Sequence, residues 1–84
     1  MTKEQFIEWM DMGLEIQFES NGIGYSICQL ADENGKAYLS FCEYNQETLD
    51  APNAEALWDS SYKGMKVSTI LSIVLESEID GLVL

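Results

Sequence analysis

Residues 15–27, EIQFESNGIGYSI, determine the fold more than any other stretch of the chain. Apolar and polar residues alternate before and after Asn21-Gly22, as they do in strands with one buried face. Asn-Gly is typical of a type I′ turn, because both central residues of that turn need positive φ angles. The stretch therefore predicts a β-hairpin with a two-residue turn.

The turn also predicts the register of the hairpin, because a slip of one residue would exchange its two faces. Phe18 then lies opposite Tyr25, and Ile16 lies opposite Ile27. These four residues share one apolar face with Leu14. The other face carries, on its two strands, Glu15, Gln17 and Glu19, and Gly24, Ser26 and Cys28.

A second hairpin is predicted from residues 31–44, ADENGKAYLSFCEY. Glu33-Asn34-Gly35 suits a three-residue loop in which the glycine adopts the left-handed conformation of a bulge. This loop places Phe41 opposite Ile27 and keeps the apolar face continuous. A two-residue Asn34-Gly35 turn is the alternative, and it would place Phe41 on the other face beside Cys28. We favour the three-residue loop.

The first helix is predicted over residues 3–12, where apolar side chains recur at helical spacing. Thr2 caps this helix in a capping box with Gln5, and Gly13 ends it. A second, short helix is predicted over residues 53–60, after the polar connection 45–53. Either Asp50 or Asn53 caps it.

The C-terminal third begins with a second break at residues 61–66, SYKGMK. Ser68 is the predicted cap of a final helix over residues 69–77, with a buried apolar stripe. The apolar tail, residues 79–84, forms a short strand or extends against the core. The fold class is therefore α+β in one domain, residues 1–84. It has an N-terminal helix, a three-stranded antiparallel meander and two C-terminal helices, packed on one sheet face.

The net charge of the chain limits the classes of partner that it can bind. Fifteen acidic residues and four lysines, without arginine or histidine, give a net charge of −11. Binding DNA, RNA or an anionic membrane needs cationic groups against phosphates, so we expect none of these as direct partners. The same charge attracts a basic protein and speeds the encounter. The alternative is that the acidity serves only solubility.

Several residue types needed for catalysis are missing. Without histidine there is no general base with an ordinary pKa near neutral pH, so we expect no enzymatic activity. Cys28 and Cys42 are expected to be free, and we expect no metal or other cofactor. Asp32, Glu33 and Asn34 resemble calcium ligands faintly, but a plain turn fits them better. No apolar run reaches the roughly 18 residues of a membrane span. The start of the chain is not a signal peptide, so we expect a cytoplasmic protein in a bacterial host cell.

The chain resembles a known group of proteins through EIQFESNGIGYSI, YLSFCEY, Leu57-Trp58 and YKGMKVSTIL at residues 62–71. Together these stretches are similar to a family of small, acidic, mostly uncharacterised proteins of Firmicutes and their phages. Ser20 stands where that pattern has an aromatic residue. The resemblance implies a fold and a mobile-element context. A looser similarity, in size, acidity and element order, is to phage anti-CRISPR and other anti-defence proteins that mimic DNA.

Two functional hypotheses follow, and each has its own candidate residues. The first is an inhibitor with a DNA-like negative surface that binds a basic protein. Its candidates are Glu15, Glu19, Asp32, Glu33, Glu43, Glu47 and Asp50. The second is a protein-interaction or immunity-type module anchored by aromatic residues, which dominate binding hot spots. Its candidates are Tyr38 and Tyr44, with Trp9 or Trp58.

Overall fold

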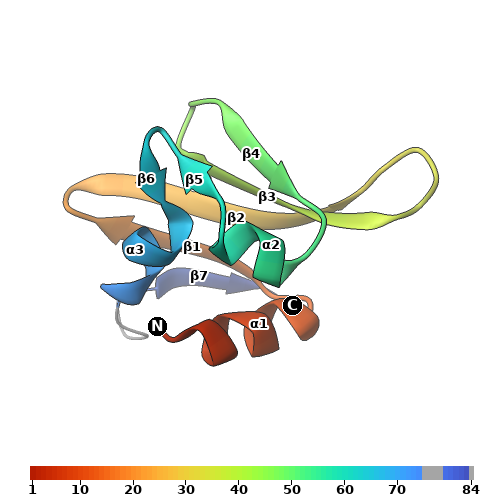
Figure 1. Cartoon of the computed structure of the whole chain (residues 1–84), viewed down its shortest axis with the longest axis horizontal. Helices are drawn as coiled ribbons and strands as arrows, with labels where there is room; N and C mark the ends of the chain where they lie inside the picture. Colours follow the sequence, from red (N-terminus) through yellow and green to blue (C-terminus); the bar gives the residue numbers. More distant parts are fainter. Residues whose placement is uncertain (75–78, 84) are drawn as a thin grey trace.

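The N-terminal hairpin has the predicted register in the computed structural model, which describes residues 1–74 and 79–83 (Figure 1). Strands β1 (Glu15–Ser20) and β2 (Ile23–Ala31) are antiparallel, with Phe18 opposite Tyr25. Asn21 and Gly22 have φ angles of 53° and 78°. These are the two positive angles of a type I′ turn, so the prediction is confirmed.

The second hairpin joins β2 to β3 (Ala37–Glu43) and places Ile27 opposite Phe41, as predicted. The Asp32 N–H donates to the Lys36 carbonyl at 2.9 Å, which leaves three residues in the loop. Gly35 has a φ angle of 78°, the left-handed conformation expected of the bulge. The three-residue loop is therefore confirmed, and the alternative register is wrong.

The sheet has five strands among the described residues, in the order β4-β3-β2-β1-β7, and every neighbouring pair is antiparallel. The predicted three-stranded meander is therefore too small. Strand β4 (Thr48–Ala51) lies inside the predicted polar connection 45–53, and β7 (Ile79–Val83) pairs with β1. The tail thus takes the strand alternative for residues 79–83, while residue 84 lies outside the described residues.

The N-terminal helix α1 (Lys3–Asp11) is confirmed, together with its capping residues. The Thr2 hydroxyl accepts a hydrogen bond from the Gln5 N–H at 3.2 Å. Gly13, with a φ angle of 80°, donates to the Met10 carbonyl after the helix ends. The left-handed glycine therefore turns the chain directly into β1.

The short helix α2 (Ala54–Trp58) begins after Asn53, whose side-chain oxygen accepts from the Ala56 N–H at 2.8 Å. Asn53 is therefore the cap, and the alternative cap, Asp50, belongs to β4. The helix lies within the predicted range 53–60.

The predicted break at residues 61–66 is a small hairpin, formed by strands β5 (Ser61–Tyr62) and β6 (Met65–Lys66). Helix α3 (Val67–Ser72) follows directly, so the predicted start at residue 69 and the predicted cap Ser68 are wrong. The helix begins earlier because the fully buried Val67 continues the chain from β6 into the core. Residues 75–77 of the predicted helix lie outside the described residues.

The core lies on one face of the sheet, which we call the inner face. The described helices pack against this face, so the predicted α+β class and its one-sided layering are confirmed (Figure 1). The inner-face residues of the core are Ile16, Phe18, Tyr25, Ile27, Leu39, Phe41 and Ala51. The helices and the small hairpin contribute, among others, Phe6, Met10, Leu57, Tyr62, Val67, Ile70 and Leu71. No helix in residues 1–74 or 79–83 is long and apolar enough to cross a membrane.

Candidate partner-binding surface

The outer face, by which we mean the sheet face turned away from the described helices, is built by strand alternation. Its first row crosses four strands, because Cys28 pairs with Ser40 and Ser40 pairs with Asp50. Glu15 precedes the Ile16–Ile27 pair and completes this row beside Cys28. The second row consists of Gln17, Ser26, Cys42 and Thr48.

On the part of the outer face that strands β1 to β4 form, the carboxylates lie on β1 and β4, and β7 lies beyond β1. We call these carboxylate positions on β1 and β4 the rim. Neighbouring strands are about 4.8 Å apart, so three steps separate the backbones of Glu15 and Asp50 by about 14 Å. Glu15 and Glu19 are four residues apart on one strand, which is about 13 Å. Between the carboxylates of β1 and that of β4 lie serine and cysteine side chains that are buried or half-buried, whereas Gln17, between Glu15 and Glu19, is exposed. The result is a band of small side chains with negative charge on either side of it, on β1 and on β4.

Tyr44 adds an aromatic surface to this face. Its N–H donates to the Gly24 carbonyl at 3.0 Å, which continues the β2–β3 pairing by one residue. A Cβ atom at position 24 would collide with the Tyr44 ring, so the absence of a side chain there allows the ring to lie on the sheet. The tyrosine nevertheless remains 47% exposed. Its other surface is therefore open to a partner.

A second apolar pair lies at the far end of the outer face. Tyr38 is half-buried and pairs with Leu30, which is 46% exposed. The sequence predictions included Tyr38 but not Leu30. Alternation along β2 indicates that Leu30 belongs to the outer face, because Leu30 is two residues beyond Cys28 and shares its face. Trp9 and Trp58 lie on the helix side, partly buried against the core, and do not join this surface.

Cys28 and Cys42 are free thiols of the outer face, as predicted, and both are half-buried. Burial raises the pKa of the Cys28 thiol, and a hydrogen bond to the Glu15 carboxylate with its negative charge raises this pKa further. Cys28 is therefore a protonated donor at neutral pH rather than a nucleophile.

This contact predicts the reactivity of Cys28. In a Cys42→Ser background, Glu15→Gln removes the charge that raises the pKa of Cys28, so more thiolate is present at a given pH. We expect alkylation by iodoacetamide at pH 8 to become several-fold faster, with the pH–rate midpoint moved downward. Glu19→Gln on the same strand is the control and should leave the rate unchanged. Equal rates in both variants would contradict the Glu15–Cys28 contact.

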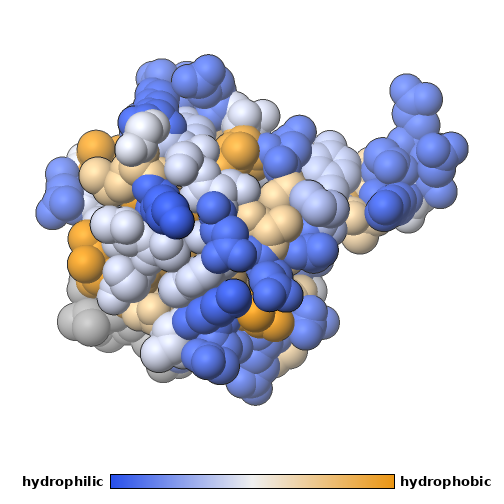
Figure 2. Space-filling view, in the orientation of Figure 1, coloured by the Kyte–Doolittle hydropathy of each residue, from blue (hydrophilic) through white to orange (hydrophobic). Residues whose placement is uncertain are grey.

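Asp32 and Glu33 lie away from the rim, at the tip of a projecting arm. We define the arm as residues 30–37, all of which are exposed. It extends beyond β1 and β4 and lengthens the molecule to 37 Å, against 25 and 21 Å in the other directions (Figure 1). Figure 2 shows its tip as a hydrophilic projection.

The Asp32 carboxylate has a structural role at this tip. One of its oxygens accepts hydrogen bonds from the Asn34 and Lys36 backbone N–H groups, both at 2.9 Å. This is the local bonding by which aspartate stabilises turns, and it explains the faint similarity of the tip to a calcium loop. Within the described residues, no group of three or more histidine, cysteine, aspartate or glutamate side chains is arranged to hold a metal ion.

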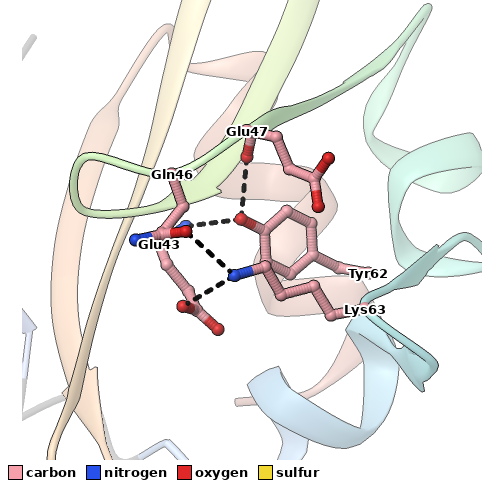
Figure 3. A network of polar contacts seen from close by, with 5 residues as sticks. All are labelled: Glu43, Gln46, Glu47, Tyr62 and Lys63. Carbon is pink, nitrogen blue, oxygen red and sulfur yellow. Dashed lines mark hydrogen bonds and ion pairs between the residues drawn. The ribbon is translucent and has the colours of Figure 1, made fainter.

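Glu43 and Glu47 belong to a third location, a polar network beside the small β5–β6 hairpin (Figure 3). The Lys63 ammonium lies 3.3 Å from a Glu43 carboxylate oxygen and 3.3 Å from the Gln46 side-chain oxygen. Partial desolvation lowers the pKa of Lys63, but the hydrogen bond and charge of Glu43 outweigh it and raise this pKa overall. Glu43 is therefore already partnered by a cation.

The Tyr62 hydroxyl is the buried centre of this network (Figure 3). It accepts from the Glu43 backbone N–H at 3.1 Å and donates to the Glu47 carbonyl at 2.7 Å. Both ends of the turn between β3 and β4 are thus tied to one side chain. The network positions β4 and the outer-face residues that β4 carries.

Removing this hydroxyl should weaken the protein measurably. Tyr62→Phe leaves the Glu43 N–H and the Glu47 carbonyl without their partner, which costs about 1–3 kcal/mol of unfolding free energy. Urea denaturation followed by tryptophan fluorescence measures the change. Lys63→Met, which removes the ammonium contacts with Glu43 and Gln46 but keeps the Tyr62 hydroxyl, is the control and should cost less than Tyr62→Phe. A Tyr62→Phe variant as stable as the wild type would refute the role of the hydroxyl.

The nine predicted site residues therefore divide among three places. The outer face carries Glu15, Glu19, Asp50, Tyr38 and Tyr44; the arm tip carries Asp32 and Glu33; and the polar network holds Glu43 and Glu47. Only the first group forms one continuous surface.

Comparisons of the chain with protein-family models, curated proteins and solved structures found no match. The resemblance to small Firmicutes and phage proteins therefore stays a prediction, and the geometry of the outer face carries the functional argument.

Proposed function

We propose that this protein binds a basic protein partner through its outer face and acts without catalysis of its own. The observation that carries the proposal is the outer face, which none of the described helices covers and whose rim carries carboxylates. Neither ion pair among the described residues includes Glu15, Glu19 or Asp50. Their charges are therefore available to cations from outside the molecule.

The partner class that fits best is a nucleic-acid-binding protein, because such proteins carry cationic surfaces built for phosphates. B-DNA presents one charge per about 1.7 Å of its axis, or about eight over 13 Å. Three rim carboxylates do not match that density by themselves. The net charge of −11 supplies long-range attraction, and the outer face supplies the contacts that remain after docking.

Binding of this kind would exclude nucleic acid from the partner and inhibit it. Together with the resemblance described above, this makes an inhibitor from a phage or other mobile element the most specific form of the proposal. Its target would be a host defence protein of the CRISPR type, in the bacterial cytoplasm. The protein itself would bind neither nucleic acid nor membranes, because its field repels both.

Capture with competition tests this function. The immobilised protein is exposed to a bacterial lysate at low salt, and duplex DNA is then added. We expect basic nucleic-acid-binding proteins to be captured and then released by DNA, because both ligands need the same cationic surface. Captured proteins that are not basic, or that DNA fails to release, would contradict the proposal.

A second candidate function is favoured by the apolar side chains of the outer face. Tyr44 and Leu30 are 47% and 46% exposed, and Tyr38 lies beside Leu30. In this alternative the protein is an intracellular interaction or immunity-type module, and its acidity serves only solubility. Salt distinguishes the two functions, because added ions screen exposed charges but not apolar contacts. Binding that survives about 0.5 M salt and is lost in Tyr44→Ser supports the module.

A further inference from the structure

A hollow lies where three elements meet, and Tyr38 of the outer face is one of the residues that line it. The C-terminal end of α1, the base of the arm and the start of α2 surround a space of ≈ 160 Å³. It occupies the concave corner below the arm in Figure 2. A cavity of about 150 Å³ is large enough to bind benzene, so this one has room for a four-carbon chain.

The walls of the hollow combine apolar and polar side chains. Met10, Leu39 and Pro52 are among its apolar residues, and the exposed Asp11 also lines it. The Gln29 amide nitrogen is already directed at the helix end, where it donates to the Met10 carbonyl at 2.7 Å and lies 3.4 Å from the Leu14 carbonyl. The group that this amide leaves for a ligand is therefore its oxygen, an acceptor.

The position of Asp11 is unfavourable for the helix itself. It is the last residue of α1, where the helix dipole is negative, and no basic residue stands in the last turn. Neither ion pair within residues 1–74 includes Asp11. A carboxylate at the negative end of a helix, beside a hollow that the Gln29 amide also lines, attracts a cation.

We infer that the hollow receives a lysine side chain of the basic partner, and this inference rests on the proposed function. The butyl stem would lie against Met10, Leu39 and Pro52, and the ammonium would meet Asp11 and the negative end of α1. The hollow would thus form a second contact of the same partner, which adjoins the outer face at Tyr38.

Nuclear magnetic resonance with a small probe tests this inference. The ¹⁵N-labelled protein is titrated at low salt with Nα-acetyl-lysine methylamide, and with the norleucine analogue, which has the same stem but no charge. We expect the lysine probe to shift saturably the signals of Asp11, Leu39 and the Gln29 side-chain amide. The norleucine probe should shift them much less.

Two matched variants separate the hollow from the general acidity. Asp11→Asn should weaken binding of the lysine probe by about two- to fivefold, the range of an exposed ion pair. Asp59→Asn, at the end of α2, should leave it unchanged. Asp11→Asn should also keep or raise the melting temperature, because the carboxylate opposes the helix dipole. A lower melting temperature would give Asp11 a folding role and overturn the inference.

Different experimental results would refute the hollow as a binding site and the proposed function. A lysine probe that shifts exposed carboxylates everywhere alike would overturn the hollow as a site and leave the outer face untouched. A probe that binds the hollow, while lysate capture finds no basic protein, would instead overturn the proposed function. It would then remove the partner that this inference assumes.

Discussion

Phe41→Ala is expected to lower the free energy of unfolding by about 3–5 kcal/mol, the usual cost of truncating a buried phenylalanine. Phe41 is fully buried on β3, a central strand of the sheet. Its ring stacks on Tyr25 at 5.5 Å between ring centroids and meets the Tyr62 ring edge-on at 5.1 Å. Truncation therefore leaves a cavity and removes two aromatic contacts at once. Because small domains are stable by only about 5–15 kcal/mol, the variant should be close to unfolding at room temperature.

Urea denaturation measures this loss, with Trp9 and Trp58 as fluorescent reporters on the helix side of the core. Thr48→Ala is the matched control, because it truncates an exposed residue on β4, the strand whose Leu49 pairs with Phe41, and it should cost less than about 0.5 kcal/mol. A loss below about 1 kcal/mol for Phe41→Ala would mean that the core is not centred on this strand.

The hairpins could be predicted from the sequence because two local signals agree in each of them. At residues 15–27, the turn chemistry of Asn21-Gly22 and the alternation of apolar residues require the same register, and the structure has it. Strand β4 offers no such agreement. It contributes only Leu49 and Ala51 to the inner face, and two alternating apolar residues among polar ones do not distinguish a strand from a loop.

Tertiary contacts determine where α3 starts and whether the tail forms a strand or an extended segment. Val67 follows the small hairpin directly and is fully buried in the core. The helix therefore begins without a side-chain cap, and the prediction that Ser68 caps it is wrong. Strand β7 forms because β1 has a free edge after pairing with β2. A free edge is a property of the assembled sheet and does not appear in the residues of the tail themselves.

Only those residues of the candidate site that alternate along a strand could be placed from the sequence. Alternation places Glu15, Glu19 and Tyr38 on one face, where the structure has them. Glu43 lies opposite Tyr25 on the inner side, and its cation, Lys63, is 20 residues away in the sequence. The hollow beside Asp11 has no sequence signal, because three separate elements form it.

The second large effect concerns binding. Glu15→Lys together with Glu19→Lys reverses two rim charges of the outer face, so both would meet the cations of the partner with the same sign. Like charges across an interface cost several kcal/mol, so we expect the affinity for the captured basic protein to fall at least about a hundredfold. Circular dichroism and the urea midpoint should show that the double variant still folds.

The matched control carries the same change in net charge on another part of the molecule. Glu4→Lys with Glu8→Lys places two lysines on the exposed side of α1. The field of the whole protein changes alike in both double variants, so any difference in affinity comes from the position of the charges. The control should lose only the modest affinity that reduced long-range attraction explains, less than about fivefold.

The most direct test of a partner-binding outer face is therefore the dissociation constant of these two double variants for the same basic partner, measured by titration calorimetry at one salt concentration. We predict that Glu15→Lys with Glu19→Lys weakens binding at least about a hundredfold, and Glu4→Lys with Glu8→Lys less than about fivefold. Equal weakening by the two variants would contradict the account, because binding would then depend on net charge alone and not on this face.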